Sequence, residues 1–205
     1  MVHTVEIFYS FQCPYSYLAM DRLSQISAKY DVSVLWQPYS SRVRAAGDKA
    51  PSQPSERVTY AREDAPRMAR SMNMPLVMPE EWPGEYFDGD KIVRGALAAS
   101  ELGVIMEYNI KVFHRMWGEG LDPTEQTFLM ELCDDLDINP NEFAGRMSTS
   151  EIRSRVRGNF NRSRKLGVFD TPMVLINDER FHGLDRIDQI EEKLKELGTV
   201  KPAWV

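Results

Sequence analysis

Cys13 is the residue with the clearest chemistry, because it stands in the segment SFQCPYS, where a strand pattern gives way to a helical pattern. At a helix N-terminus, backbone N–H groups and the helix dipole favour the thiolate, and the thiol pKa falls from about 8.5 to roughly 3.5–7.5. An inert cysteine buried in the core is the ordinary alternative. The neighbours Gln12 and Pro14 belong to a strand-to-helix corner rather than to a core face, which favours a nucleophilic thiol at Cys13.

Ser16 occupies the position at which a second cysteine would complete a Cys-x-x-Cys redox pair. Disulfide exchange at Cys13 would therefore need an outside thiol to resolve it. The other cysteine of the chain, Cys133, lies in FLMELCDDL among leucines at helical spacing. That spacing is typical of a buried helix face, so we expect Cys133 to be an inert core thiol rather than a distant redox partner.

A second candidate site lies in the segment FHGLDRI, where Asp185 precedes the last helical pattern. Asp185 has the residue type of an ordinary N-cap. A helix N-terminus beside a carboxylate also suits a γ-glutamyl group, since N–H groups can bind its carboxylate and Asp185 its ammonium. His114 and His182 are assigned no role, because a lone histidine is more often structural than catalytic.

The elements that must position these residues follow from hydrophobic spacing. A strand over 2–9, a helix over 15–30 and an alternating strand over 31–38 predict a β-α-β unit with parallel strands. A polar loop covers 40–55, and after a helical block TPMVLIND and ERFH predict two strands, followed by an amphipathic helix over 185–197. The helices of the block are predicted at 55–73, 91–102, 105–117, 123–136, 140–147 and 150–166.

Composition excludes several classes of protein. The 205 residues carry 25 basic and 31 acidic side chains, a net charge of −6, and the basic residues do not form one stripe in the sequence. We therefore expect no nucleic-acid partner. No segment approaches the roughly 20 apolar residues of a membrane span, and the first residues lack a signal-peptide pattern, so we expect no membrane association and a cytoplasmic protein. No cysteine or histidine has metal-ligand spacing, so we expect no metal site.

Six phrases occur along the chain in a specific order: FYSFQCPYSYLA, YAREDAPRMARSMNMPLVMP, VRGALAASELG, FHRMWGEGLD, RKLGVFDTPMVLIND and FHGLDRID. Their order and spacing closely resemble the family of 2-hydroxychromene-2-carboxylate isomerases and kappa-class glutathione transferases, relatives of the DsbA-like oxidoreductases. The resemblance runs nearly end to end.

The resemblance implies an α/β chain with a thioredoxin fold (β-α-β then β-β-α) and a large all-helical insertion domain. The thioredoxin-like domain would comprise residues 1–50 and 168–205, and the inserted helical domain residues 51–167. The resemblance also implies a homodimer in which glutathione, the cofactor, lies between the two domains.

The same resemblance implies a glutathione site. A cis Pro172 would turn the preceding backbone outward, so that the N–H and C=O groups of Thr171 can pair with an extended thiol ligand. Trp82 and the nearby loop are expected on the substrate side. The residues expected to bind glutathione are Tyr15, Ser16, Thr171, Pro172, Leu184, Asp185, Asp48 and Arg57.

Two positions depart from the family pattern. The relatives normally carry a serine where this chain has Cys13, and a thiol is a poorer hydrogen-bond donor than a hydroxyl. In the polar loop the relatives tend to place an asparagine and, further on, a lysine. The nearest matches in this chain are Asp48 and Arg57, and an aspartate is unfavourable beside an anionic tripeptide.

Three hypotheses on function remain open. The first is a glutathione-dependent isomerase or transferase that acts on a small aromatic or otherwise electrophilic compound, with the thiol of bound glutathione as the nucleophile. The alternative is a DsbA-like monothiol disulfide oxidoreductase in which Cys13 forms a mixed disulfide with glutathione. The third is a non-catalytic protein that binds a thiol ligand or partner. The architecture favours the first hypothesis, and the identity of Cys13 favours the second.

Overall fold

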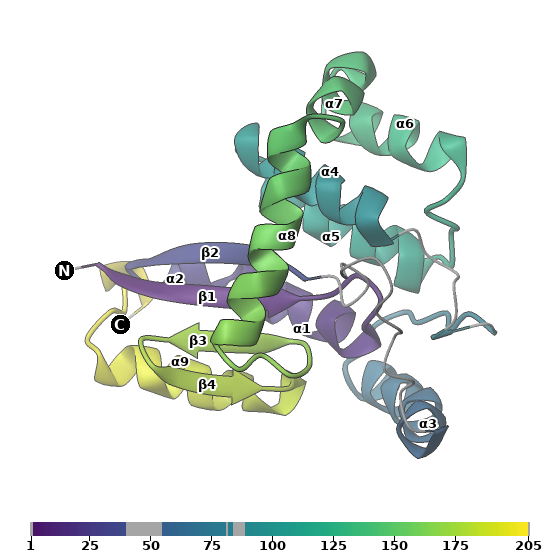
Figure 1. Ribbon diagram of the computed structural model, residues 1–205. Coiled ribbons are helices and arrows are strands. Elements are labelled where there is room, and N and C mark those ends of the chain that lie inside the picture. The colour runs from purple at the N-terminus through teal and green to yellow at the C-terminus, as the bar shows by residue number, and fades with distance from the viewer. Residues whose placement is uncertain (1, 40–54, 81, 84–88, 205) are drawn as a thin grey trace.

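The computed structural model describes residues 2–39, 55–80, 82–83 and 89–204 (Figure 1). Four strands form one mixed sheet in the order β2-β1-β3-β4. β1 (His3–Tyr9) pairs in parallel with β2 (Val32–Pro38) and antiparallel with β3 (Met173–Ile176), which pairs antiparallel with β4 (Glu179–His182). The β-α-β and β-β-α units and the thioredoxin fold predicted from the sequence are therefore confirmed.

Helices occupy the described part of the chain between β2 and β3. In Figure 1 most of them lie above the sheet, whereas α3 lies apart from the others, toward the end of the sheet to which β1 points. Their boundaries agree with the sequence prediction to within about one turn. They are α3 (Ser55–Ser71), α4 (Gly89–Glu101), α5 (Ile105–Phe113), the π-helical turn η1 (His114–Gly118), α6 (Gln126–Asp135), α7 (Pro140–Met147) and α8 (Ser150–Lys165).

The first helical region differs from the prediction of one helix over 15–30. It consists of α1 (Pro14–Ser24) and α2 (Ile26–Lys29), separated at Gln25. The apolar spacing continues through this break, so the sequence pattern does not reveal it. Pro14 lies in the first turn of α1, as predicted. The N–H groups of a first turn have no intrahelical acceptor, so a proline, which lacks an N–H, removes no hydrogen bond there.

The chain between β4 and the last helix corrects the prediction that Asp185 is an N-cap. Gly183 has a φ of 103°, a left-handed conformation that favours glycine, and the 3₁₀ helix η2 (Leu184–Arg186) follows it. α9 (Ile187–Glu196) begins only after η2, and no side chain caps it. Asp185 therefore lies within a turn that leads into the helix.

The core joins the sheet to the helical block through aromatic side chains. Tyr9, at the end of β1, is fully buried and donates a hydrogen bond to Oδ1 of Asn109 on α5, at 2.8 Å. Phe11 packs against Phe113 with ring centroids 4.8 Å apart. These contacts fix the strand-to-helix corner that precedes Cys13 against α5.

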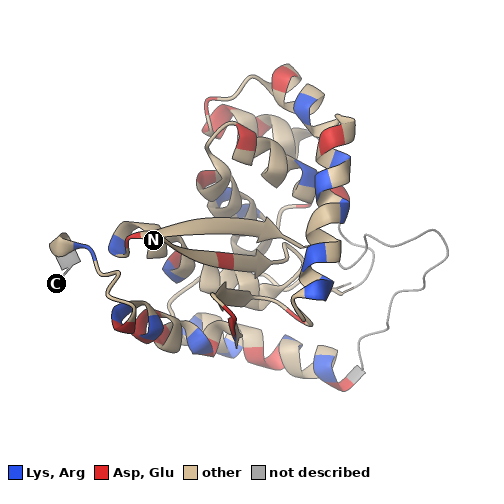
Figure 2. Cartoon of the chain, turned by 60° about the vertical axis from the view of Figure 1, so that its left-hand side comes forward, with Lys and Arg blue, Asp and Glu red and all other residues tan. Residues whose placement is uncertain are grey.

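Charged residues of both signs are interspersed along most of the helices, but basic residues gather on α8 (Figure 2). The basic residues are therefore less evenly scattered in the structure than the sequence as a whole indicates. Two of its arginines are paired with acidic residues of other elements, Arg155 with Glu101 at 2.9 Å and Arg162 with Glu6 at 2.6 Å. These ion pairs attach α8 to α4 and to β1.

Candidate active site

Cys13 is the N-cap residue of α1, with φ −107° and ψ 115°. Its backbone N–H donates to the Ser10 carbonyl at 3.0 Å, and its own carbonyl accepts from the N–H groups of Ser16 at 3.1 Å and Tyr17 at 3.3 Å. The turn is therefore closed by backbone hydrogen bonds on both sides of the cysteine. The half-buried side chain is held at the position that the sequence predicts.

The Cys13 thiol faces the loop that enters β3. Its Sγ atom donates a hydrogen bond to the carbonyl oxygen of Thr171 at 3.0 Å. The Thr171–Pro172 peptide bond is cis, as predicted for this loop. The structure thus brings together three of the predicted site residues, from segments far apart in the chain.

The protonation state of Cys13 corrects a prediction. Burial raises the pKa of the thiol, and the nearby Asp170 carboxylate raises it further, against hydrogen bonds from Ser16 and Thr171 that lower it. The sequence prediction of a lowered pKa is therefore wrong, because the desolvation and the negative charge outweigh the hydrogen bonds that favour the thiolate. Around neutral pH the group is a thiol and acts as a hydrogen-bond donor.

Ser16 and Tyr15 each help to shape the turn around Cys13 through a polar side chain. Ser16 is fully buried, and its Oγ accepts a hydrogen bond from the N–H of Ser10 at 3.3 Å. The Tyr15 hydroxyl donates to Oδ2 of Asp64 on α3, at 3.1 Å. Ser16 thus helps to close the corner, and Tyr15 connects it to the helical block.

Asp170 is a site residue that the sequence analysis missed. One carboxylate oxygen accepts the backbone N–H of Thr171 at 2.8 Å. The other accepts an ion-paired hydrogen bond from Arg57 on α3 and lies 4.0 Å from Nε2 of His182. Arg57 therefore reaches the candidate site through Asp170. The position of Asp170 in GVFDTP, directly before Thr171, was the feature of the sequence that could have indicated its role.

Leu184 and Asp185 lie next to the proline loop. The N–H of Gly183 donates to the carbonyl of Pro172 at 2.9 Å, which joins the start of η2 to that loop. Leu184 is buried, whereas the side chain of Asp185 is largely exposed and lies 3.5 Å from the Arg186 guanidinium. Asp48 lies outside the described residues.

Two tryptophans hold the segment that precedes Cys13. Nε1 of Trp82 donates to the Gln12 carbonyl at 2.7 Å, and Nε1 of Trp117 donates to the Phe11 carbonyl at 2.8 Å. Both side chains are buried, so Trp82 supports the turn instead of lining the substrate side as expected. The sequence offers no spacing signal for either hydrogen bond.

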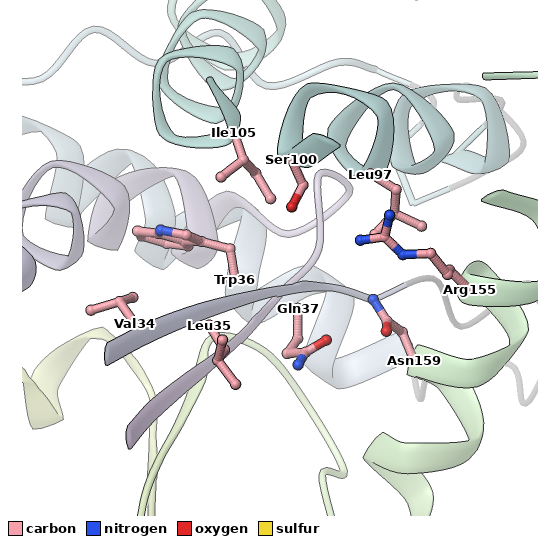
Figure 3. A pocket seen from close by; sticks show the side chains of 9 residues that line it. All are labelled: Val34, Leu35, Trp36, Gln37, Leu97, Ser100, Ile105, Arg155 and Asn159. Carbon is pink, nitrogen blue, oxygen red and sulfur yellow. The ribbon is translucent and has the colours of Figure 1, made fainter. Parts of the chain in front are cut away.

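A groove of about 190 Å³ lies elsewhere in the fold, between β2, α4, the start of α5 and α8 (Figure 3). Trp36, Leu97 and Ile105 form its apolar side, and Arg155 and Asn159 of α8 form its polar side. None of the predicted site residues lines it. It is therefore separate from the chemistry at Cys13.

Within the described ranges, no three His, Cys, Asp or Glu side chains are grouped so that they could hold a metal ion. Among the same residues, none of the helices has the length and apolar character needed to span a membrane.

The sheet order, the cis proline loop and Cys13 at the start of α1 define a thioredoxin-fold protein with a helical insertion. The chain belongs to the family described as DSBA-like thioredoxin domain, which it matches over residues 4–195.

Individual relatives cover nearly the whole chain. A 2-hydroxychromene-2-carboxylate isomerase of Sphingobium xenophagum is 26% identical over 200 residues, which cover 95% of this chain and 99% of the relative. Human glutathione S-transferase kappa 1 is 20% identical, over 98% of this chain and 95% of the relative. The structure of a 2-hydroxychromene-2-carboxylate isomerase is similar with a TM-score of 0.80, at 24% identity, over 95% of this chain and 96% of that one. Cytosolic disulfide reductase DsbM from Pseudomonas aeruginosa, in a structure with GSH, has a TM-score of 0.68 at 17% identity, over 95% of this chain and 97% of that one.

Proposed function

We propose that this protein is a glutathione-dependent isomerase or transferase that acts on a small aromatic or otherwise electrophilic compound. The observation that carries the proposal is the hydrogen bond that the Cys13 thiol donates to the Thr171 carbonyl beside cis Pro172. The raised pKa of this thiol supports the proposal. The full-length similarity to 2-hydroxychromene-2-carboxylate isomerases and to a kappa-class glutathione transferase supports it.

Several residues around this point support the proposed glutathione site. The carbonyl oxygen of Thr171 accepts a hydrogen bond from the Cys13 thiol, which shows that this carbonyl is accessible to a donor, and in the proposed complex it accepts the N–H of an extended peptide-like ligand. Arg57 supplies a positive charge at the same loop, suited to a carboxylate of the tripeptide. Leu184 and Asp185, joined to the loop through Gly183, would hold the γ-glutamyl end. Asp48, Tyr15 and Ser16 complete the proposed set.

Bound glutathione would supply a thiol nucleophile that adds to the electrophilic carbon of the substrate and, in an isomerase, leaves again. Cys13 then acts as a hydrogen-bond donor that stabilises the developing negative charge on the attacking sulfur. Asp170 keeps the Cys13 proton in place by raising the pKa of that thiol. The Trp82 and Trp117 hydrogen bonds hold the turn so that the donor stays in position.

The proposal is tested by adding glutathione and 1-chloro-2,4-dinitrobenzene, a general aromatic electrophile, and by measuring glutathione binding calorimetrically. We expect binding and a conjugation rate that saturates with glutathione and exceeds the uncatalysed rate. Absence of both glutathione binding and glutathione-dependent conversion of any electrophile in a panel would overturn the proposal.

A monothiol oxidoreductase is the second candidate, favoured by the position of Cys13 at the start of α1 with Ser16 in place of a resolving cysteine. Here the Cys13 thiolate attacks oxidised glutathione, forms a Cys13–glutathione disulfide and releases one glutathione thiolate. The thiolate of a substrate protein then attacks the glutathione sulfur of that disulfide, which forms a substrate–glutathione disulfide and releases the Cys13 thiolate. Intact mass after exposure to oxidised glutathione at pH 7, with Cys13→Ser as the control, separates the candidates: a rapid, Cys13-dependent adduct would favour this second function.

We further propose that residues 1–50 and 168–205 form the thioredoxin-like domain, that residues 51–167 form the inserted domain, and that the protein is a cytoplasmic homodimer. The domain division is supported by the return of the chain to the sheet at β3 after the helices. Light scattering of the purified protein would test the dimer.

A further inference from the structure

Three residues of α3 lie along one side of that helix. Arg57, Tyr60 and Asp64 are spaced by three and four residues, which places them within about one third of the helix circumference. The neighbouring face, which contains Ala61 and Ala65, is buried against the rest of the protein. The Arg57 side of α3 therefore borders the buried face.

Arg57 and Asp64, the first and last residues of this row, contact the two segments that contain Thr171 and Cys13. Arg57 is ion-paired with Asp170, the residue before Thr171, and Asp64 accepts the hydroxyl of Tyr15, two residues after Cys13. Because Cys13 and Thr171 touch each other, α3 is attached at two points that flank the candidate site. In Figure 1, α3 accordingly lies near the N-terminal end of α1.

Tyr60 lies between these two attachments. Burial makes the largest contribution to the raised pKa of the Tyr15 hydroxyl, and Asp64, Tyr60 and Cys13 raise this pKa further. Tyr60 and the Cys13 thiol are thus both close enough to Tyr15 to influence the same group. This places the Tyr60 side chain at the edge of the candidate site.

Tyr60 is the large aromatic residue at this edge whose ring remains uncovered. It is 58% exposed, and among the described residues no ring packs against it and no hydrogen bond fixes its hydroxyl. Phe169, the other exposed aromatic near the site, already rests on His182 with ring centroids 4.7 Å apart. An exposed ring on a helix that is anchored on both sides of the candidate site is suited to stack on a planar ligand.

We propose that Tyr60 is a specificity-determining residue that stacks on the aromatic part of the electrophilic substrate while the electrophilic carbon faces the bound thiol beside Cys13. This inference rests on the proposed glutathione site and adds the residue that selects planar aromatic compounds over small aliphatic ones. Its hydroxyl is not required for stacking, so phenylalanine should replace it.

The test compares two stable ligands that share the glutathione part and differ only in the group on sulfur: S-methylglutathione and S-(4-nitrobenzyl)glutathione. Dissociation constants are measured by calorimetry for the wild type, Tyr60→Ala, Tyr60→Phe and Met130→Ala. Met130 is a control because it is 52% exposed and lies on α6, away from the α3 row.

We expect Tyr60→Ala to weaken binding of the nitrobenzyl ligand about three- to tenfold and to leave the methyl ligand unchanged. Tyr60→Phe and Met130→Ala should bind both ligands as the wild type does. Equal binding of the nitrobenzyl ligand by the wild type and Tyr60→Ala would overturn the role of Tyr60 while leaving the glutathione site standing. Binding of neither ligand by the wild type would overturn the glutathione site and the inference together.

Discussion

The sulfur of Cys13 donates a hydrogen bond to the carbonyl oxygen of Thr171 at 3.0 Å, although 158 residues separate them in the chain. In the proposed complex the same carbonyl accepts the backbone N–H of a thiol ligand, so Cys13 needs another acceptor. The sulfur of the ligand is the group that arrives beside it. The contact therefore explains how one thiol can be fixed in place and then stabilise a second, reacting thiolate.

The Cys13 thiol should be slow to alkylate at neutral pH, because burial and Asp170 raise its pKa. Its reaction with iodoacetamide should accelerate only as the pH rises through this raised pKa. Asp170→Asn removes a negative charge, so the midpoint of the rate profile should move to lower pH. Asp185→Asn is the control. A profile that is identical in the wild type and Asp170→Asn would contradict the role given to this carboxylate.

The two cysteines should differ sharply in how accessible their thiols are to an alkylating reagent. Cys133 is buried in α6 at 2% exposure, whereas Cys13 is partly exposed. Alkylation of the native protein followed by peptide mass mapping should modify Cys13 alone, and Cys133 should react only after unfolding in urea. Modification of Cys133 at the same rate as Cys13 would show that α6 opens readily.

Replacement of Arg57 by alanine should weaken glutathione binding several-fold, because it removes the positive charge at the Thr171 loop. The unfolding free energy should fall by less than about 1 kcal/mol, since the Arg57 side chain is 58% exposed and its ion pair is screened by solvent. Arg67→Ala is a matched control: Arg67 lies on the same helix, is also 58% exposed and pairs with Asp64. Equal glutathione affinity of the two variants would remove Arg57 from the site.

Ser16→Cys should create a dithiol redox pair with Cys13, because the first turn of α1 brings the two positions together. On oxidation the variant should lose two hydrogens by intact mass, and it should reduce insulin disulfides in the presence of a thiol. The wild type should do neither. Failure of the variant to form the internal disulfide would mean that the turn does not have the geometry described for it.

Trp117→Phe should destabilise the protein by about 1–3 kcal/mol, because it loses a hydrogen bond to the Phe11 carbonyl and leaves space in the core. Trp82→Phe loses the corresponding bond to Gln12 and should act in the same direction. Urea denaturation measures both changes. If the glutathione affinity of the folded variants were unaffected, the tryptophans would stabilise the fold without positioning the site.

The sequence predicts the order of the elements well because each carries its own periodic signal. The alternation in residues 2–9 and 31–38 and the apolar runs near the C-terminus are sufficient to place all four strands of the observed sheet. The break at Gln25 between α1 and α2 and the short η2 turn before α9 are not predicted by such patterns. They depend on backbone geometry that leaves the apolar spacing unchanged.

The candidate site was predicted only in part for a related reason. Cys13, Thr171 and Pro172 have recognisable local contexts, and the structure brings them together. The roles of Asp170 and Trp82 arise from contacts between distant segments, which a single sequence does not encode as a spacing. The pKa of Cys13 depends on that same surrounding protein, so helix position alone predicted its direction wrongly.

Glutathione-dependent turnover of an aromatic electrophile in Cys13→Ser and Cys13→Ala measures which thiol reacts, that of bound glutathione or that of Cys13. If the thiol of glutathione reacts and Cys13 only donates a hydrogen bond, the serine variant should keep most of the activity, because its hydroxyl also donates. The alanine variant should lose about ten- to a thousandfold, as expected when one hydrogen-bond donor to a developing anion is removed. Loss of all activity in the serine variant, together with a Cys13–glutathione disulfide in the wild type during turnover, would contradict the account and assign the chemistry to Cys13 itself.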